Sequence, residues 1–484
     1  LRRLRPRAAM RIVVAVAGVA GAWLLWKRLK QYLEYRGKKL PPVYREGCHV
    51  PMLGAALQFL SDPLKMARRA QDVHGDIFTV YVLGKRLTFM CGPDAQENFC
   101  RARDDELSQQ QAYKFSVPLF GPGVVYDADL EKRTEQIKFV TNSLHTTAIG
   151  QYVPMMVDEA EKYFASWGDE GVVDIYTALA ELIILTASRC LMGPEIRSEL
   201  HKEVSELYAI LDKGCTPISF FAPYFPIPAH FKRDKARRQM VALFQKVIEK
   251  RRKENKRYND VLQVYMDATY KNGEKLPAHE VTGLLIALLF AGQHTSSVTS
   301  TWTGLYMLEH KKDLVPALIE EQKKLGKVID HEAIKNMSLL HATVTEALRM
   351  QPPLIFVMRE VLQDRQFKDY TIPKGDVIFL SPSLSGRRPD VWTNPDSFDP
   401  YRFLEPREEH RKFSHGWLGF GGGRHRCLGE HFAYVQIKTI WAYLLRNFEM
   451  EAVGPLPSPN YEALVVGPKH PCLIRYVRRK LPID

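Results

Sequence analysis

The sequence predicts a mainly helical protein with a minor β part, and three observations support this fold class. Between about residues 150 and 350, apolar residues recur at three- and four-residue spacing, which is typical of amphipathic helices. Short stretches of alternating apolar residues precede and follow that region, at 76–92 and 369–380. A small sheet, then a long helical body, then mixed strands and loops is an order that argues against a doubly wound parallel sheet.

Size and composition agree with a folded domain. The chain has 484 residues, of which 45% are hydrophobic and 25% charged, as in globular proteins and unlike disordered ones. Length alone would allow two or three lobes. The formal net charge of +13 predicts a surface that attracts acidic partners. Because the basic residues are scattered and no nucleic-acid-binding motif is present, we expect no nucleic acid partner.

The amino end carries an apolar run, IVVAVAGVAGAWLLW at 12–26, between basic flanks. The run is shorter than the roughly 20 residues that span a bilayer, but flanking Lys and Arg side chains can snorkel to the lipid headgroups. A secretory signal peptide is the alternative, although no small-x-small cleavage site follows Trp26. We therefore expect residues 1–36 to be a membrane anchor with basic flanks. Residues 37–54 are predicted to be a Pro- and Gly-rich linker, and residues 55–484 the catalytic domain.

Two segments outside the helical region predict strands. DIFTVYVLGKRLTFMCG at 76–92 alternates around a Gly-Lys turn, and DYTIPKGDVIFL at 369–380 follows the same period. The number of cysteines is odd and none are spaced as in a zinc site, so we expect no disulfide framework and reduced thiols that face the cytosol. The cysteines are Cys48, Cys91, Cys100, Cys190, Cys215, Cys427 and Cys472.

One predicted helix, LLIALLFAGQHTSSVTSTW at 284–302, has polar residues inside an apolar run. Its apolar part is too short to cross a bilayer, which indicates a buried helix. His294 and Thr295 stand at its centre. Two structural interpretations stay open. The Thr295 hydroxyl can donate a hydrogen bond to a carbonyl of its own helix, and His294 can be a core histidine whose hydrogen bonds are made within the fold.

The stretch FGGGRHRCLGEHFA at 420–433 places one cysteine behind glycines and basic residues. Glycines allow tight turns and the close approach of a flat partner. Arg424, His425, Arg426 and the amino end of the helix predicted to follow would favour a thiolate at Cys427. An ordinary core cysteine is the alternative. A core cysteine would not require the pattern Phe-x-x-Gly-x-x-x-Cys-x-Gly, which fixes four positions within ten residues.

This loop resembles the haem-binding loop of the cytochrome P450 superfamily. The resemblance implies a haem b cofactor with Cys427 as the axial iron ligand, and a fold that holds the haem between a long central helix and the cysteine loop. EALR at 346–349 resembles the Glu-x-x-Arg of that family, and residues three apart share a helix face, so Glu346 and Arg349 can pair. FDPYRF at 398–403 would add Arg402 to the same buried network.

Further motifs resemble one branch, the sterol 14-alpha-demethylases. AGQHTS has His294 where most of the superfamily has an acid, and QAYKFSVPLFGPGVVYD at 111–127 matches the branch pattern over the substrate. The resemblance runs from about residue 40 to the end and implies that His294 and Thr295 relay protons, with an acid from another helix that the sequence does not identify. It implies that the haem propionates are bound by Tyr113, Tyr126, Arg359 and His425. A further cation is expected near Thr134 and Ile137, for which Arg133 or Lys138 could substitute.

The same resemblance implies an apolar sterol cavity. Phe115 stands where Phe is associated with sterols bearing one C4 methyl, which favours a substrate such as obtusifoliol over lanosterol. The residues implied to line the cavity are Phe115, Phe120, Ala287, Phe290, Ala291, Thr295, Leu354, Met358, Leu464 and Val465. The aromatic, Pro-rich segment 213–231 is either a membrane-facing access region or a loop packed on the core.

The implied function is removal of the 14α-methyl group of a sterol precursor as formate, in three steps that use O2 and electrons from NADPH. The implied partners are an NADPH–cytochrome P450 reductase docked on a basic face and azole-type inhibitors at the haem iron. A monomer in the endoplasmic reticulum membrane, with its catalytic domain facing the cytosol, is expected. A P450 monooxygenase acting on another lipid or a xenobiotic is one alternative. The other is a non-catalytic, membrane-anchored sterol-binding protein.

Overall fold

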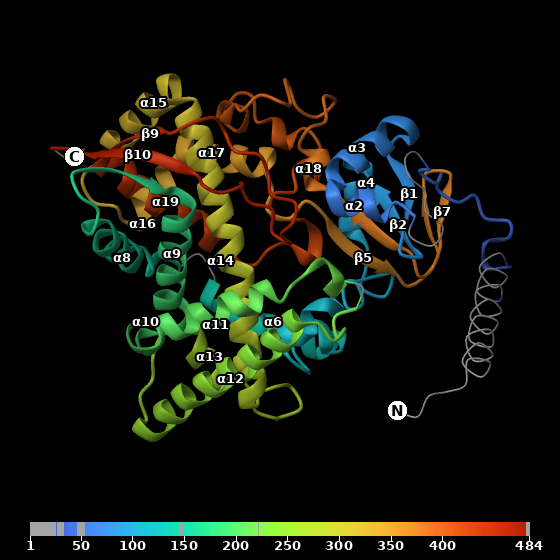
Figure 1. Cartoon of the computed structure of the whole chain (residues 1–484), viewed down its shortest axis with the longest axis horizontal. Coiled ribbons are helices and arrows are strands. Elements are labelled where there is room, and N and C mark those ends of the chain that lie inside the picture. Colours follow the sequence, from blue (N-terminus) through green and yellow to red (C-terminus); the bar gives the residue numbers. More distant parts are fainter. Residues whose placement is uncertain (1–25, 27–32, 46–53, 145–148, 221, 481–484) are drawn as a thin grey trace, which may run out of the picture.

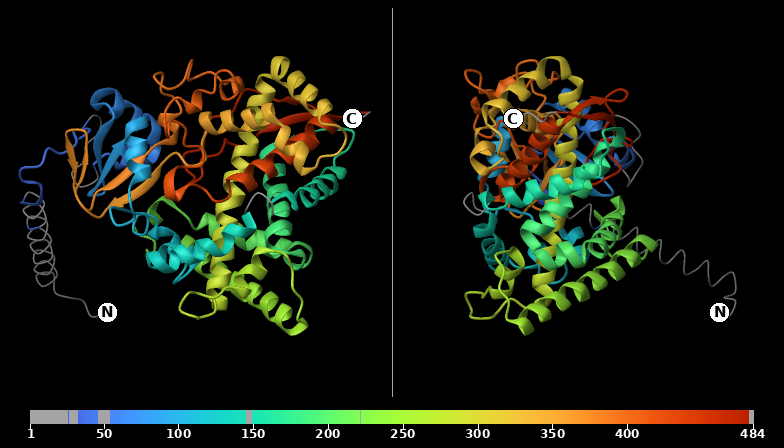
Figure 2. Two further views of the ribbon diagram at one scale, coloured as in Figure 1. Left: turned by 180° about the vertical axis from the view of Figure 1, so that it is seen from behind. Right: turned by 90° about the vertical axis from the view of Figure 1, so that its left-hand side faces the viewer.

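The computed structural model describes residues 26, 33–45, 54–144, 149–220 and 222–480. Within these residues the protein is mainly helical with a minor β part, which confirms the predicted fold class. The helical body and the largest sheet lie side by side, with the sheet at one end of the molecule (Figures 1 and 2). The predicted anchor at 12–26 lies outside the described residues, apart from Trp26.

The helices follow one another closely from residue 56 to residue 447. They are α2 (Ala56–Ser61), α3 (Pro63–His74), α4 (Pro93–Arg101), α5 (Val117–Phe120), α6 (Leu130–Thr141), α8 (Val153–Ala165), α9 (Ile175–Ala187), α10 (Pro194–Glu199), α11 (His201–Lys213), α12 (Pro228–Glu254), α13 (Val261–Asp267), α14 (Ala278–Glu309), α15 (Lys311–Lys324), α16 (His331–Asn336), α17 (Ser338–Met350), α18 (Pro382–Ser385) and α19 (Glu430–Asn447).

The strands form one larger sheet and two small ones. The larger sheet has the order β1-β2-β8-β5-β3, and the small sheets have the orders β4-β10-β9 and β6-β7. Their bounds are β1 (Ile77–Val82), β2 (Lys85–Met90), β3 (Leu107–Ser108), β4 (Glu170–Asp174), β5 (Val357–Val361), β6 (Arg365–Phe367), β7 (Tyr370–Ile372), β8 (Val377–Leu380), β9 (Phe448–Ala452) and β10 (Leu473–Arg478).

Both predicted strand segments are confirmed. β1 and β2 pair as an antiparallel hairpin whose connecting residues, Leu83 and Gly84, both have positive φ. β8 then adds in parallel to β2, and β5 adds antiparallel to β8. β3, β4, β5, β6, β9 and β10 lie outside the two segments that the sequence analysis named. Among them, β4 lies inside the region with helical periodicity and pairs with β10 near the carboxyl end.

The long helix α14 organises the helical body and runs through its middle (Figure 1). Its Trp302 is buried, and Ser300 accepts a hydrogen bond at 3.0 Å from Nε1 of Trp441 on α19. Two described helical segments, Ile175–Met192 and Ala278–Glu309, are long and apolar enough to cross a membrane, but 67% and 61% of their apolar windows are buried inside the fold. Their burial indicates core helices, as predicted for the segment 284–302.

Part of the predicted linker packs on the larger sheet. Val43 forms a bridge with Thr79 of β1, and the Tyr44 amide donates to the Thr79 carbonyl at 2.9 Å. The Tyr44 side chain is buried in the cluster that includes Phe78 and Phe89. These contacts attach the chain to the sheet before α2 begins.

Candidate active site

The loop before α19 has a shape that only glycine permits at two positions. Gly421 and Gly423 have φ values of +71° and +65°. A Cβ added at Gly423 would lie 2.1 Å from the carbonyl oxygen of Cys100, so the two loops approach to backbone contact. The Cys427 amide donates to the Phe420 carbonyl at 2.9 Å, which closes the loop and leaves the Cys427 side chain exposed.

Cys427 stands just before the amino end of α19, whose N-cap is Gly429. Burial raises the pKa of the Cys427 thiol, while hydrogen bonds from the Gly429 and Glu430 amides and the charge of Arg426 lower it. Arg426 itself is held by Glu430 at 2.6 Å. The pKa of the Cys427 thiol is raised overall. The two backbone amides are the donors that would support a thiolate, and the side chain still has a free face because the loop covers only part of it.

The core helix α14 has an open face at its centre. Ala291 is exposed, and a Cβ added at Gly292 would meet no atom within 4 Å, although most of the surrounding helix is buried. Thr295 donates its hydroxyl to the Ala291 carbonyl at 2.7 Å, which is one of the structural readings left open by the sequence. This bond leaves the lone pairs of the Thr295 oxygen free to accept a further proton donor.

Arg359 on β5 is a buried cation without a carboxylate partner among the described residues. Its Nη1 donates to the Phe99 carbonyl at 2.8 Å and its guanidinium lies 4.2 Å from the Phe99 ring centre. Its Nε has no hydrogen-bond partner in the described part of the chain. Burial lowers the pKa of Arg359. Such a group indicates a site for an anionic ligand group.

Two phenols lie near this arginine. Tyr113 stacks on Tyr126 with ring centres 5.0 Å apart, and the Met358 amide donates to the Tyr113 oxygen at 3.3 Å. Burial raises the pKa of both phenols, so both stay neutral and can donate hydrogen bonds. The charge of Arg359 acts on both, which places the three residues in one electrostatic neighbourhood.

Asp104, a residue that the sequence did not single out, gathers three basic side chains. Nε2 of His425 lies 2.8 Å from its carboxylate, Arg424 lies 3.3 Å away and Arg133 of α6 lies 3.8 Å away. Arg133 is buried, whereas Lys138, the other candidate for the missing cation, is exposed. Asp104 thus holds His425 and Arg133 together, and leaves Nδ1 of His425 for another partner.

The Cys427 loop and the group formed by Arg359, Tyr113 and Tyr126 fit a haem. A soft thiolate on a glycine-shaped loop suits the iron, and a flat macrocycle can approach a loop without side chains at 421–423. A buried arginine with an unpartnered Nε and two neutral phenols suit the propionate carboxylates. The described residues contain no group of three His, Cys, Asp or Glu side chains that could hold a separate metal ion.

His294 has an acidic neighbour, Asp212 on α11. Nε2 of His294 lies 3.1 Å from the Asp212 carboxylate, which is close enough for an ion pair when the imidazole is protonated, although this nitrogen makes no hydrogen bond within the described residues. The Asp212 side chain is 42% exposed and that of His294 is 21% exposed. The pair thus connects solvent with the centre of α14, and it joins residues that are far apart in the sequence.

Glu346, Arg349 and Arg402 form one fully buried network. The Glu346 carboxylate lies 2.6 Å from Nε of Arg349 and 3.0 Å from Nε of Arg402, and all three side chains have 0% exposure. Arg402 also pairs with Glu409 at 3.0 Å, and Arg349 donates to the carbonyls of Gly386, Pro395 and Ser397. The network ties α17 to the segment that leads into the cysteine loop.

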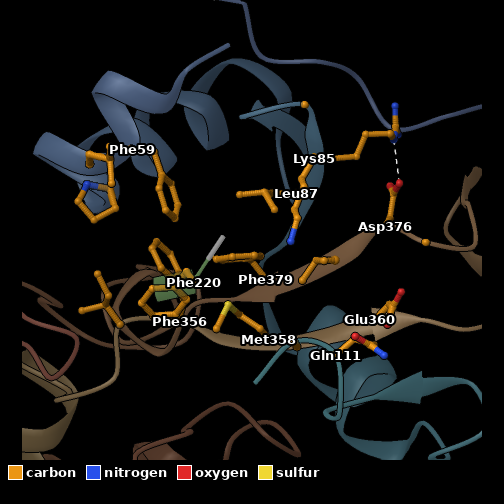
Figure 3. Close-up of a pocket in the computed structure, with 18 of the residues that line it drawn as sticks. Phe59, Lys85, Leu87, Gln111, Phe220, Phe356, Met358, Glu360, Asp376 and Phe379 are labelled. Atoms are coloured by element: carbon orange, nitrogen blue, oxygen red, sulfur yellow. Dashed lines mark hydrogen bonds and ion pairs between the residues drawn. The ribbon is translucent and has the colours of Figure 1, made fainter. Parts of the chain in front are cut away.

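The structure contains a cavity of about 960 Å³ between the larger sheet, α2 and the segment after α11 (Figure 3). Three of the residues implied by the sequence, Leu354, Met358 and Leu464, line it. Phe220 lines it too and packs on Phe115 with ring centres 4.1 Å apart. Phe220 comes from the aromatic segment 213–231, which indicates that part of this segment covers the cavity instead of facing away from it.

The other implied cavity residues lie elsewhere. Phe120 and Phe290 contact each other, with ring centres 6.0 Å apart, and Ala287, Ala291 and Thr295 lie along α14. Neither these residues nor Val465 and Cys427 belong to the described residues that line the cavity. The cavity, which we call the outer chamber, is therefore lined by a different set of residues from the open face of α14. The sequence missed Phe59, Phe356 and Phe379, because nothing in their local patterns distinguishes a lining residue from a core residue.

Fold and site together define a class, the haem-thiolate monooxygenases. The profile of the cytochrome P450 family matches residues 45–474. Among solved structures, a cyanobacterial cytochrome P450 with bound retinoic acid has a TM-score of 0.82 at 23% identity, over 92% of this chain and 100% of that chain, and so shares the fold.

Two plant proteins are similar over nearly the whole chain. An obtusifoliol 14-alpha demethylase of Sorghum bicolor is 45% identical over 98% of both chains, and a sterol 14-demethylase of Arabidopsis thaliana is 47% identical over 92% of both. A lanosterol 14-alpha demethylase of Mus musculus is 38% identical over 92% of this chain and 88% of its own length. This chain belongs to the cytochrome P450 family and, within it, to the sterol 14-demethylases. Membership implies a haem cofactor and oxygen-dependent monooxygenation.

Proposed function

We propose that this protein removes the 14α-methyl group of a sterol precursor as formate, in three successive steps that consume O2 and NADPH. The observation that supports this most strongly is the 45–47% identity to obtusifoliol and sterol 14-demethylases over at least 90% of the chain. The preferred substrate is a sterol with one C4 methyl, such as obtusifoliol. The names of the Sorghum bicolor and Triticum aestivum relatives and the position of Phe115 support this preference.

The bound haem supplies the iron chemistry that activates dioxygen. Cys427 would hold it through its thiolate, and its propionates would be held by Arg359, Tyr113, Tyr126 and His425. Arg133 is the further cation on the propionate side, acting with His425 through Asp104. The open face at Ala291 and Gly292 leaves room for the reacting methyl group beside α14.

His294 and Thr295 deliver protons to the reacting oxygen, with Asp212 as the acid that recharges His294. The 3.1 Å contact between Asp212 and His294, the partial exposure of Asp212 and the free lone pairs of Thr295 support this route. A proton from solvent reaches Asp212 and passes to Nε2 of His294. The imidazolium formed in this way releases the proton on its Nδ1 toward the Thr295 oxygen, and the Thr295 hydroxyl passes its own proton onward.

Asp212→Asn tests this route. We expect it to lower the rate of formate release about 100-fold or more, because proton transfer by a positioned side chain typically contributes about 100- to 10,000-fold, and to raise the NADPH consumed per formate formed. Sterol affinity should stay unchanged. The control is Glu206→Gln, which removes an exposed carboxylate of the same helix. Normal coupling of NADPH to product in the Asp212 variant would exclude Asp212 from the relay.

Phe115→Leu tests the substrate preference. Phe115 is buried against Phe220 and Tyr113, so a smaller side chain leaves space for a second C4 methyl. A pocket discriminates one methyl by about 10- to 200-fold, and we expect kcat/KM to shift about 10-fold toward C4-dimethyl sterols. Phe139→Leu, which alters a ring packed on Tyr270, is the control. An unchanged ratio of the two sterol classes would contradict the assigned role of Phe115.

The proposed partners include an NADPH–cytochrome P450 reductase and azole-type inhibitors, and the proposed form is a monomer. The +13 net charge supports a basic docking face, and Arg411, Arg424 and Arg426 supply exposed cations along the chain that leads to α19. The basic run at 249–257 contributes less than its sequence suggests, because Arg251 is buried between Glu195 and Asp260. We also propose that residues 1–36 anchor the protein in the endoplasmic reticulum membrane, with the catalytic domain in the cytosol.

Turnover by the purified, haem-loaded protein tests the function directly. With reductase, NADPH and a panel of 14α-methyl sterols, formate and the demethylated sterol should appear in equal amounts. Turnover of another lipid or a xenobiotic without any demethylated sterol would favour a different monooxygenase. Sterol binding without any turnover would favour a binding protein.

A further inference from the structure

The outer chamber has two chemically different ends (Figure 3). One end is aromatic and contains Phe59 of α2, Phe220, Phe356 and Phe379. At the other end the lining residues include Glu360, Gln111 and Asp376 (Figure 3). A cavity with an apolar body and one polar end suits an elongated amphiphile.

Glu360 differs from the other acids on the chamber wall. Asp376 is fully used, because Nε of Arg86 lies 2.9 Å from one of its oxygens and the Thr88 hydroxyl donates to the other at 2.8 Å. Glu462 is exposed, and Glu34 has a partner. Oε2 of Glu360 is buried and has no hydrogen-bond partner among the described residues. A buried acceptor of this kind needs a donor, and its burial also raises the pKa of Glu360.

The charges around Glu360 select the type of donor. Lys85 and Lys374 act on Glu360 electrostatically and line the same chamber. Their charges would oppose a cationic ligand group, whereas the carboxylates of Glu360 and Asp376 would oppose an anionic one. A neutral hydroxyl avoids both penalties. It can donate to Oε2 of Glu360 and accept from the Gln111 amide.

We propose that Glu360, with Gln111, forms a subsite in the outer chamber that binds the hydroxyl group of an incoming sterol. The sterol rings lie against the aromatic end of the chamber, away from Cys427, Ala291 and Thr295, so the subsite captures the substrate before it reaches the open face of α14. This inference rests on the proposed function for the identity of the ligand. Beyond that function, it assigns Glu360 the role of binding the polar end of the ligand.

Binding to the full-length, haem-loaded protein tests the subsite. Stopped-flow mixing would compare the association rate constants of obtusifoliol and of its 3-O-methyl ether, which lacks the hydroxyl donor. Glu360→Leu is expected to slow the association of obtusifoliol about 10-fold, the scale of one hydrogen bond to a charged group, and to leave that of the ether within about 2-fold. Glu360→Gln keeps an acceptor oxygen and should give a smaller loss.

Two further measurements separate capture from structural damage. Glu320→Leu makes the same change at an exposed acid of α15 that does not line the chamber, and it should leave the association rate constants of both ligands unchanged. The carbon monoxide difference spectrum should be identical in all variants. With obtusifoliol, Glu360→Leu should lower kcat/KM about 10-fold at unchanged kcat, because a capture site acts before the chemical step.

The outcomes for the subsite and for the proposed function are distinct. Equal losses for obtusifoliol and its ether, or no loss for either, would overturn the subsite even if the enzyme demethylates sterols normally. A loss confined to obtusifoliol in a protein that forms no demethylated product would support the subsite and refute the demethylase function.

Discussion

Cys427→Ser is expected to abolish the strongly red-shifted Soret band that the reduced protein gives with carbon monoxide. That band requires a thiolate on the iron, and a serine hydroxyl remains protonated in a site where even the thiol has a raised pKa. The amides of Gly429 and Glu430 stabilise a sulfur anion but cannot offset the much weaker acidity of an alcohol. We expect monooxygenase activity to fall below detection, even where haem is retained.

Cys100→Ser is the matched control for this change. Cys100 is buried next to the same loop, with its sulfur 2.9 Å from the position that a Cβ of Gly422 would occupy. It should keep the red-shifted band, because Cys100 is not the cysteine assigned to the iron and burial raises the pKa of its thiol to about 11. A red-shifted band in the Cys427 variant, or its loss only in the Cys100 variant, would refute the assignment of the ligand.

Glu346→Ala is expected to cause the largest loss of stability. The substitution leaves Arg349 without its carboxylate in a site where both side chains have 0% exposure, and among the described residues Arg402 keeps Glu409 as its one carboxylate partner. Breaking a buried ion pair by removing one partner costs about 3–5 kcal/mol. Because the network ties α17 to the segment before the cysteine loop, we also expect little haem to be retained.

The free energy of unfolding in denaturant and the haem content of the purified protein would measure this effect. Glu320→Ala is the control, because Glu320 and Lys323 form an ion pair with the same i, i+3 spacing on a helix surface, where both side chains are more than half exposed. Screening by solvent makes such a pair nearly neutral. Similar free energies of unfolding for the two variants would show that the buried Glu346 network contributes no more to stability than an exposed ion pair.

Local patterns predicted the fold class and much of its detail. The β1–β2 hairpin, the buried helix α14 and the start of α19 after Cys427 each depend on periodicity or turn residues within one short segment. β4 was missed because its partner strand, β10, lies some 300 residues later, and its five residues carry no signal of their own. Long-range pairing is invisible to local propensity.

The candidate site divides in the same way. Cys427, Glu346, Arg349 and Arg402 stand in dense, short motifs, so the sequence alone could single them out. Asp104, which collects His425, Arg424 and Arg133, stands in an ordinary charged loop and was not predicted. Arg133 is preferred to Lys138 as the proposed propionate-side cation because Arg133 is buried and Lys138 is exposed. Both residues lie on α6, and which of them is buried depends on how that helix packs.

The sequence by itself determined the class of this protein, the cysteine that would hold the iron and the branch of the family, because each depends on residues adjacent in the chain. Only the tertiary structure decided that Asp212 is the acid beside His294 and that Phe220 covers Phe115. It alone also showed that Oε2 of Glu360 is buried without a donor in the outer chamber. The physical reason is common to all three: partnership and desolvation arise between segments brought together by packing, and neither is encoded in the spacing of residues along one segment.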